Sequence, residues 1–250
     1  EDRPLGFRMI RDVFWPWIHR GYWADLMRWH EAFLQNCDGI SSASVAVVRC
    51  HRAAALATMG AALDARADGE MALQDLRRSS STADLAECLF MLGIVVSNCG
   101  DQDATQKYQE ECVVLTKGTD SPYHAAALWV LGSMAAARHD LETAETLSRQ
   151  VHDEWVRAGS ERGKSNLALL LGEIAWVRGD LVGSDQIYCD GLDRARRSGN
   201  LFQERYFLRR LGSVAALQGD YASAHAYHRA YGILCAKGAV PRLVADALAA

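Results

Sequence analysis

No apolar run in the sequence reaches the length of a membrane-spanning helix, which takes about 20 consecutive apolar residues. A secretory signal peptide is not recognisable at the N-terminal end. Basic residues are not in excess, because 27 Lys and Arg stand against 31 Asp and Glu and the formal net charge is −4. This balance does not favour a nucleic-acid partner. We therefore expect a cytoplasmic protein that binds neither membranes nor nucleic acid directly.

Metal-ligating patterns are also lacking. The seven cysteines are an odd number at scattered positions, and no two of them form a Cys-x-x-Cys pair. Such cysteines are expected to be reduced thiols, and buried ones behave as small hydrophobic residues. Cys50-His51 would need ligands from elsewhere to bind zinc, and His225 and His228 have no evident third ligand. We expect no metal and no cofactor.

Sequence motifs of catalysis are missing as well. The sequence has no Gly-x-x-x-x-Gly-Lys-Ser/Thr phosphate loop and no Gly-x-Ser-x-Gly nucleophile elbow. Carboxylate pairs such as Glu110-Glu111 fall on helical faces where charge is the default. We expect a binding module, and an enzyme is the weakest of three alternatives.

The segment from Leu208 to Tyr227 shows what the sequence is built from. Apolar residues recur at helical spacing, Gly219-Asp220 interrupts them, and a second apolar stripe follows. The pattern predicts two helices joined by a tight turn. Two helices approach closely only where side chains are small, so we expect Gly212 on the first helix to face Ala224 on the second.

The same unit recurs along the chain. Its key glycines, Gly93, Gly132, Gly172 and Gly212, are 39, 40 and 40 residues apart. Each precedes a turn that ends in Asp, and Met59-Gly60 followed by Ala67-Asp68 matches less cleanly. We predict an all-α fold, a right-handed superhelical solenoid of about six helix-turn-helix repeats. Residues 1–250 would form one solenoid, with approximate repeats 1–40, 41–80, 81–121, 122–160, 161–200 and 201–237, and 238–250 would start a truncated further repeat.

This pattern resembles the tetratricopeptide repeat (TPR), which couples Leu-Gly in a first helix to Gly-Asp-Tyr and a small residue in a second. Leu211-Gly212 and Gly219-Asp220-Tyr221 carry the resemblance. The family period is about 34 residues, so the repeats here have longer helices or loops. The resemblance implies the fold strongly and the function weakly, because such solenoids bind many unrelated partners.

The N-terminal segment is rich in large aromatic residues. Its Phe14 stands where later repeats have Gly, so we expect a hairpin that is splayed or differently packed. Pro16 would interrupt the first helix or lie at a kink. The aromatic residues either cap the end of the core or form a docking surface for a preceding domain. They are Phe14, Trp15, Trp17, Tyr22, Trp23, Trp29 and Phe33.

Two stretches, Phe14-Trp15-Pro16-Trp17-Ile18-His19-Arg20-Gly21-Tyr22 and Trp29-His30-Glu31-Ala32-Phe33-Leu34, resemble the opening of a larger array. Similar arrays follow the ATPase and winged-helix domains of bacterial signal-transduction ATPases (STAND proteins) of the antibiotic-regulatory-protein and maltose-activator-like types. The resemblance implies an array that senses an inducer or partner and contacts a preceding ATPase and winged-helix region. The ATPase itself is not in this sequence, since the phosphate loop is missing.

Ligand binding in such solenoids uses the concave face, which is lined mainly by the first helix of each pair. If the TPR resemblance holds, fixed offsets from each key Gly point there, and in the third unit they give Glu87, Phe90, Ile94, Ser97 and Asn98. Aromatic side chains mixed with Arg, Glu and Asn suit a peptide or small-molecule groove. The alternative for Trp129 and Trp176 is packing against neighbouring helices. The candidate binding residues are Phe90, Asn98, Trp129, Asn166, Glu173, Trp176, Tyr206 and Arg209.

The resulting functional prediction is a non-catalytic sensor or interaction module of a larger bacterial transcriptional regulator. Its partner would be a protein, a peptide or a small-molecule effector. The alternative is a stand-alone TPR scaffold or peptide receptor.

Overall fold

The computed structural model describes residues 3–59, 61–79 and 81–237. Over these residues the chain forms twelve α-helices and no strand. The helices follow one another in six helix-turn-helix pairs, as the periodicity predicts. Residues 238–250, for which we predicted the start of a further repeat, lie outside the described residues.

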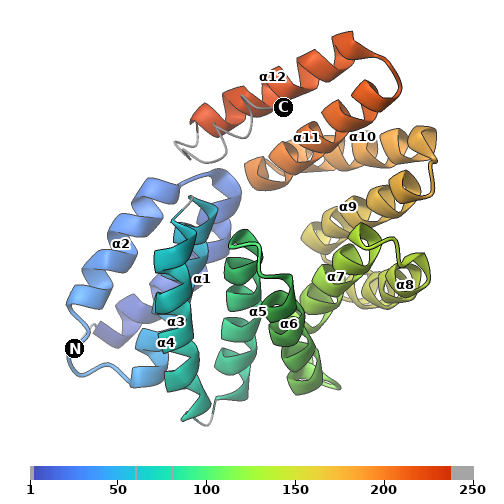
Figure 1. Cartoon of the computed structure of the whole chain (residues 1–250). Coiled ribbons are helices and arrows are strands. Elements are labelled where there is room, and N and C mark those ends of the chain that lie inside the picture. The colour runs from blue at the N-terminus through green and yellow to red at the C-terminus, as the bar shows by residue number, and fades with distance from the viewer. Residues whose placement is uncertain (1–2, 60, 80, 238–250) are drawn as a thin grey trace. The chain divides into compact units, whose positions relative to one another are not determined.

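The described chain divides into two compact units, one that ends at His124 and one that runs from Ala125 to Lys237. In unit 1, α3 packs against both α4 and α5, and α5 packs against α6 (Figure 1). Helix α1 also contacts α3, so three first helices lie near one another in this unit. The helices of unit 1 are α1 (Arg3–Arg20), α2 (Trp23–Gln35), α3 (Ser42–Thr58), α4 (Ala62–Arg77), α5 (Thr82–Asn98) and α6 (Gln102–Thr116).

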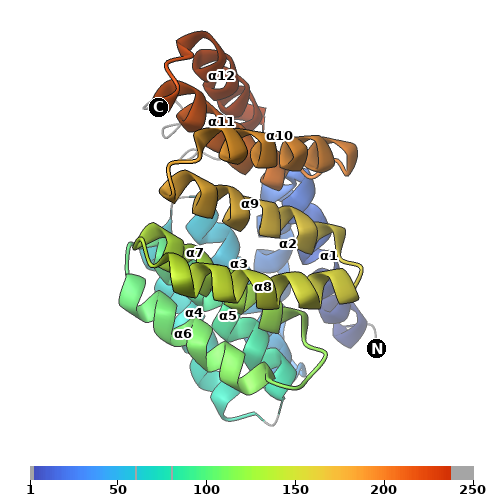
Figure 2. The same cartoon turned by 90° about the vertical axis from the view of Figure 1, so that its right-hand side faces the viewer.

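In unit 2, each helix packs against the next from α8 to α12, and α11 also contacts α9 (Figure 2). Two successive first helices therefore lie side by side. Helix α7 begins in unit 1 and continues in unit 2. The bounds are α7 (Pro122–Ala137), α8 (Leu141–Arg157), α9 (Glu161–Val177), α10 (Leu181–Arg197), α11 (Leu201–Leu217) and α12 (Tyr221–Lys237).

The recurring Asp is the N-cap of the second helix in four pairs. Each carboxylate accepts a hydrogen bond from a backbone N–H in the first turn, as Asp180 does from Gly183 at 2.8 Å, and Asp101, Asp140 and Asp220 do the same. This bond satisfies a donor that the helix start would leave unpaired. The residue before the Asp takes a positive φ, which glycine adopts without strain.

The side chain that faces the key glycine within a hairpin differs from our prediction. A Cβ at Gly212 would lie 2.6 Å from the His228 ring, so the side chain nearest to this glycine is His228 and not the predicted Ala224. Gly172 makes room for Tyr188 in the same way, where the distance would be 2.3 Å. In both pairs the glycine allows a ring on the second helix to lie against the backbone of the first.

The second pair has a different register from the one we predicted. Ala67-Asp68 is not a turn, since Asp68 lies inside α4 and accepts hydrogen bonds from Arg52 at 2.8 and 2.9 Å. In this pair the glycine lies on the second helix instead of the first. Ala53 occupies the first helix and Gly69 the second, and a Cβ at Gly69 would lie 3.6 Å from the Cβ of Ala53. The prediction failed because it assumed that the glycine is always on the first helix; Gly60 itself lies outside the described residues.

The aromatic residues of the first pair divide between core and surface. Phe14 and Trp23 are buried, and the Phe14 ring stacks on His51 at 4.1 Å. Tyr22 and Trp29 are 51% and 47% exposed. The capping interpretation therefore holds for the first two, whereas the other two are available on the surface.

Proline does not interrupt the first helix. Pro16 lies inside α1, which continues past it to Arg20, so that alternative was wrong.

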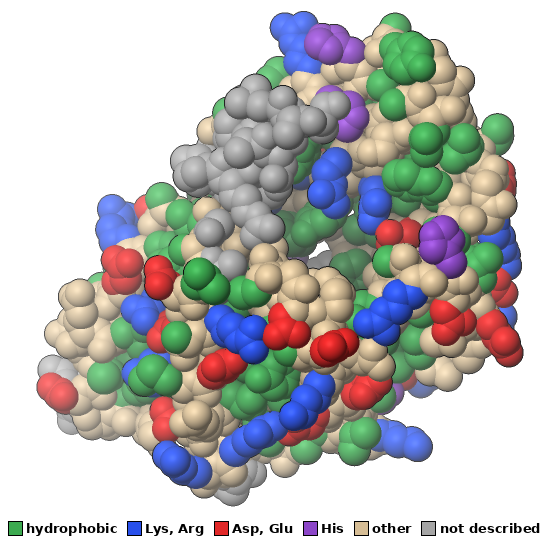
Figure 3. Space-filling model, viewed as in Figure 1, with side chains coloured by type: hydrophobic (Ala, Val, Ile, Leu, Met, Phe, Trp, Pro, Cys, Tyr) green, Lys and Arg blue, Asp and Glu red, His purple; other side chains and the backbone are tan. Residues whose placement is uncertain are grey.

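The surface of unit 1 carries both signs of charge. Acidic and basic side chains alternate over the lower left of the face in Figure 3. Several pair with each other, including Arg66 with Asp101 at 2.8 Å and Arg77 with Glu111 at 2.7 Å. Exposed pairs of this kind add little stability, and the mixture gives no extended field of one sign.

Candidate functional site

The two candidate binding residues on α5 are engaged within unit 1. Phe90 is 5% exposed, and its ring lies 5.5 Å from Tyr123 and 6.4 Å from Trp15. Asn98 donates a hydrogen bond to the Ile94 carbonyl of its own helix at 3.0 Å. Phe90 thus packs against neighbouring aromatic rings, and the Asn98 side chain is hydrogen-bonded within its own helix.

In unit 2, Trp129 is half-buried and packs against a core cluster that includes Ala136, Leu170 and Ile174. Packing against neighbouring helices, the alternative we gave for this residue, describes it well. Asn166 accepts a hydrogen bond from Gln203 at 2.7 Å, which joins α9 to α11.

Glu173 and Trp176 are brought together by a residue that the sequence did not single out. Arg210 on α11 donates to Glu173 at 2.7 Å, and its guanidinium lies 5.5 Å from the Trp176 ring. A guanidinium over an indole face gains a cation–π attraction. The three side chains form a fixed group across α9 and α11. Helical spacing predicted that Arg209 lies on the binding face, whereas its neighbour Arg210 makes this contact.

Tyr206 and Arg209 lie on the same helix as Arg210. Tyr206 is 41% exposed, and the Arg209 guanidinium is 5.8 Å from its ring. The Phe202 ring is 5.1 Å from Tyr206. This part of α11 therefore presents an aromatic side chain and a half-buried arginine that has no ion-pair partner among the described residues.

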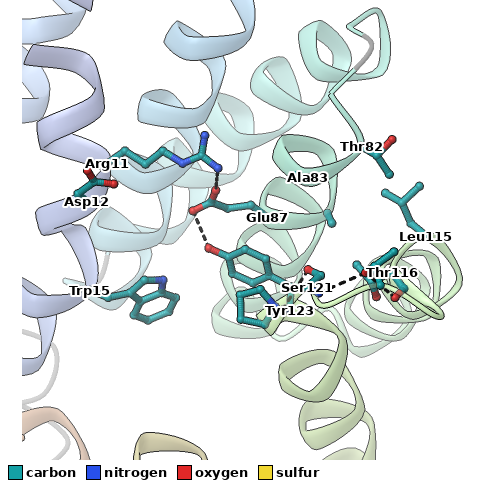
Figure 4. A pocket seen from close by; sticks show the side chains of 13 residues that line it. Arg11, Asp12, Trp15, Thr82, Ala83, Glu87, Leu115, Thr116, Ser121 and Tyr123 are labelled. Atoms are coloured by element: carbon teal, nitrogen blue, oxygen red, sulfur yellow. Dashed lines mark hydrogen bonds and ion pairs between the residues drawn. The ribbon is translucent and has the colours of Figure 1, made fainter. Parts of the chain in front are cut away.

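Unit 1 contains a cavity of about 550 Å³ that our sequence analysis did not predict (Figure 4). Its walls come from α1, α5, the end of α6, the following loop and the start of α7. The lining residues are Arg11, Asp12, Trp15, Thr82, Ala83, Ala86, Glu87, Leu115, Thr116, Thr119, Ser121, Pro122 and Tyr123.

Glu87 is the buried charged group of this cavity, with a side chain that is 4% exposed. It contacts Arg11 Nη2 at 2.5 Å, His51 Nε2 at 2.7 Å and the Tyr123 hydroxyl at 2.7 Å. Burial alone would raise its pKa. The hydrogen bond and charge of His51, together with the Tyr123 hydroxyl and the charge of Arg11, outweigh burial and lower the pKa of Glu87 to about 2. The carboxylate is therefore ionised at neutral pH.

Tyr123 links the carboxylate to the aromatic wall. Its hydroxyl donates to Glu87 at 2.7 Å, and its ring lies 5.5 Å from the Phe90 ring. Burial and the adjacent Glu87 raise the pKa of Tyr123, so the hydroxyl keeps its proton. Arg11 also binds Asp84 at 2.6 Å. Polar bonds thus fix each of these side chains before any ligand arrives.

Two histidines lie behind the carboxylate. His51 and His30 are fully buried, with ring centroids 6.2 Å apart, and His30 bonds the Leu26 carbonyl at 2.7 Å. Burial lowers the pKa of His30 to about 4, against the opposing effect of that backbone bond. His30 is therefore neutral at pH 7.

The residues of this cavity are far apart in the sequence. Only Glu87 was among the positions that the repeat spacing placed on the binding face. Arg11 and Trp15 belong to the atypical first pair, which has no key glycine. Tyr123 lies at the beginning of α7, far before the key Gly132 of that helix. The aromatic richness of the first segment was the available signal.

Neither a metal cluster nor a spanning helix is found in the part of the chain that the structure describes. Its His, Cys, Asp and Glu side chains form no group of three that could hold a metal ion. None of its helices combines the length and apolarity needed to cross a membrane.

No protein-family model matches the sequence, and no curated protein matches it. Solved structures do match. A Rap protein in complex with competence and sporulation factor superposes with a TM-score of 0.80 at 13% identity, over 96% of this chain and 66% of that chain. The apo form of RapI gives a TM-score of 0.74 at 11% identity, over 98% of this chain and 86% of that chain.

A STAND protein with a tetratricopeptide-repeat sensor, from Pyrococcus horikoshii, is also similar. Its TM-score is 0.60 at 11% identity, over 90% of this chain and 36% of that chain. At these identities the matches establish the fold alone. The fold is a TPR-like helical-repeat solenoid, as the Leu-Gly and Gly-Asp pattern predicted. This chain spans only about a third of the STAND protein and 66% of the Rap chain.

Proposed function

We propose that this chain is a non-catalytic binding module that recognises a peptide or protein segment through the first helices of its repeats. The similar Rap protein was solved with competence and sporulation factor. Solenoids of this class commonly present such surfaces. The proposal for this chain depends on its own side chains.

The observation that carries the proposal is the α9–α11 surface of unit 2. Arg210 holds Glu173 and Trp176 in place, while on α11 Tyr206 has exposed ring area and Arg209 has no ion-pair partner among the described residues. Tyr, Trp and Arg are the residues that most often dominate binding energy at interfaces. Because the Arg210 contacts are already formed, little side-chain entropy is lost when a ligand arrives.

The experiment is a selection of displayed peptides on the purified chain, followed by calorimetric titration of the selected peptide. We expect Tyr206→Ala and Arg209→Ala each to weaken binding by roughly fivefold or more, the usual effect of an interface hot spot. Gln186→Ala is the matched control, because Gln186 is exposed on the second helix α10. Binding that both α11 variants leave unchanged, with folding intact by circular dichroism, would return these residues to ordinary packing.

We further propose that the module is the sensor of a larger bacterial transcriptional regulator of the STAND type. The aromatic opening segment and the similarity to a STAND protein with a TPR sensor support this context. In it, a ligand held across several repeats would favour one arrangement of the helices and so affect a preceding ATPase. The exposed Tyr22 and Trp29 would contact that region.

A reporter assay tests the regulator context in the intact gene product. Trp176→Ala and Arg209→Ala should reduce inducer-dependent transcription, and Gln186→Ala should not. An intact reading frame with no ATPase or DNA-binding region would favour the alternative, a stand-alone TPR scaffold or peptide receptor. Peptide binding by unit 2 would be expected in either case.

A further inference from the structure

The cavity of unit 1 is a second site, separate from the α9–α11 surface, and its charge is one-sided. Among the residues that line it, Arg11 is the one basic side chain, and it already binds Glu87 and also Asp84, which is not itself part of the lining. Asp12 adds a second carboxylate to the lining and has no ion-pair partner among the described residues. The lining thus carries two carboxylates against one guanidinium, and the carboxylate of Asp84 also binds that guanidinium.

The walls offer flat aromatic and aliphatic surface. Trp15 and Tyr123 lie on adjacent sides of the cavity, and Leu115 and Ala86 complete its apolar lining (Figure 4). A cation beside an indole or phenol ring gains electrostatic attraction, more so where water is partly excluded. The combination favours a cationic group carried on an apolar body.

Glu87 retains room for a further donor. Its Oε1 accepts from His51 and Tyr123, whereas among the described residues Oε2 contacts Arg11 alone. Each carboxylate oxygen has about two acceptor positions. One acceptor position on Oε2 is left by the bonds within the protein.

An anionic ligand is the less favourable choice, although α5 and α7 begin at the cavity. The start of α5 is already capped, since Ser81 accepts from the Asp84 N–H at 3.3 Å and Asp84 lies in the first turn. Helix α7 begins with Pro122, which has no N–H to offer. The two helix starts therefore provide little for an anion.

We propose that this cavity binds a guanidinium or alkylammonium group on an apolar stem, either as a basic side chain of a peptide or as a small organic cation. The cation lies between the Trp15 ring and the carboxylates of Asp12 and Glu87. This inference does not depend on the α9–α11 surface, because the two sites share no residue.

The test compares two nearly isosteric probes, N-acetylarginine amide and N-acetylcitrulline amide, by ligand-observed NMR titration of the whole chain. Only the first is charged. We expect the arginine probe to bind roughly tenfold more tightly, as a partly desolvated cation–π contact allows, and to weaken as salt is added. A tripeptide probe, acetyl-Leu-Arg-Leu amide, distinguishes the sources: tighter binding than the single residue indicates a peptide, and equal binding a small cation.

Variants link the binding to this cavity. Asp12→Asn should weaken the arginine probe by roughly two- to fivefold, the range of one exposed charge pair, without affecting folding, because Asp12 is exposed. Asp103→Asn is the matched control, an exposed Asp of unit 1 that does not line the cavity. Trp15→Leu keeps an apolar side chain but removes the aromatic face and should weaken the charged probe more than the neutral one.

Three results would overturn the proposal. They are equal affinity for the arginine and citrulline probes, no binding of either at millimolar concentration, and unchanged arginine binding by Asp12→Asn and Trp15→Leu with native circular dichroism. Each leaves the Tyr206 and Arg209 peptide experiment unaffected. Failure of one site is thus distinguishable from failure of the other.

Discussion

Replacing Tyr123 by Phe tests the buried network around Glu87 with the removal of a single oxygen atom. The ring that lies 5.5 Å from Phe90 is kept. The hydroxyl that donates to Glu87 over 2.7 Å is lost. The remaining donors to the carboxylate are His51 and Arg11.

The expected cost follows from the kind of bond removed. A hydrogen bond to a charged group contributes about 1.5–3 kcal/mol, and a buried partner left without its bond costs more than an exposed one. Glu87 is buried but keeps two donors, so we expect the free energy of unfolding to fall by about 2 kcal/mol at pH 7. Glu87→Gln should cost on the order of 3 kcal/mol, because it leaves Arg11 without one of its two carboxylates.

The two changes should not be additive, since they act on one bond. Once Glu87→Gln has removed the carboxylate, Tyr123→Phe no longer breaks a hydrogen bond to a charged group. The total cost in the double variant should therefore be smaller than the sum by about 1–2 kcal/mol. Such a coupling energy separates a hydrogen-bonded network from two independent packing defects.

Acid should affect the same network in a defined pH range. The pKa of Glu87 is lowered from an ordinary value of 4.5 to about 2 in the folded state. The stability it contributes is therefore present above pH 4.5 and is lost as the pH falls through about 2, and its full size is on the order of 3 kcal/mol. Tyr123→Phe removes one donor and so raises the folded-state pKa of Glu87, which makes this contribution smaller and completes its loss at a higher pH than in the wild type.

The assay is urea unfolding followed by far-UV circular dichroism at pH 7 and pH 3. Because the chain has two compact units and need not unfold in one step, hydrogen exchange of the α5 amides should accompany it, to assign the change to unit 1. Additive costs of Tyr123→Phe and Glu87→Gln would refute the network. So would a Tyr123→Phe variant as stable as the wild type at both pH values.

Three other predictions concern the hairpins and a buried histidine. Gly212→Leu should overpack the contact with His228 and cost about 1–3 kcal/mol, and an unchanged melting temperature would speak against that contact. His139 has φ of +63° where other repeats have glycine, so His139→Gly should stabilise the fold by about 1 kcal/mol. An unchanged free energy of unfolding would show that the turn is not strained. The pKa of His30 falls from 6.5 to about 4, so its contribution is complete above pH 6.5 and is lost as the pH falls through 4. His30→Phe should flatten the stability profile between these values, and a profile of unchanged slope would be inconsistent with a neutral buried ring.

Prediction from the sequence succeeded where each repeat reuses the same local chemistry. A glycine in the first helix and an Asp N-cap after the turn recur because every hairpin has to close and every second helix has to start. The second pair does not follow this register, because its glycine, Gly69, lies on the second helix and faces Ala53 on the first. Any rule that fixes the glycine on one helix misses that solution.

The candidate sites were harder to predict than the fold. Helical spacing located Tyr206, Arg209, Glu173 and Trp176 on first helices, but it did not show that Arg210 would pair with two of them. The cavity of unit 1 was missed because Arg11 and Tyr123 meet Glu87 only in three dimensions. Long, flexible or aromatic side chains reach across helices in ways that periodicity does not encode.

The most direct test of peptide recognition by the first helices is hydrogen–deuterium exchange of the whole chain with and without a selected peptide. We predict that the bound peptide slows exchange in the fragments of this chain that come from α9 and α11, which contain Trp176, Tyr206 and Arg209. Exchange in α10 and α12 should change little. Tyr206→Ala should reduce that difference at the same peptide concentration while the pattern of the free chain stays the same. Slower exchange confined to the second helices, or a bound peptide that changes exchange in neither α9 nor α11, would contradict recognition by the first helices.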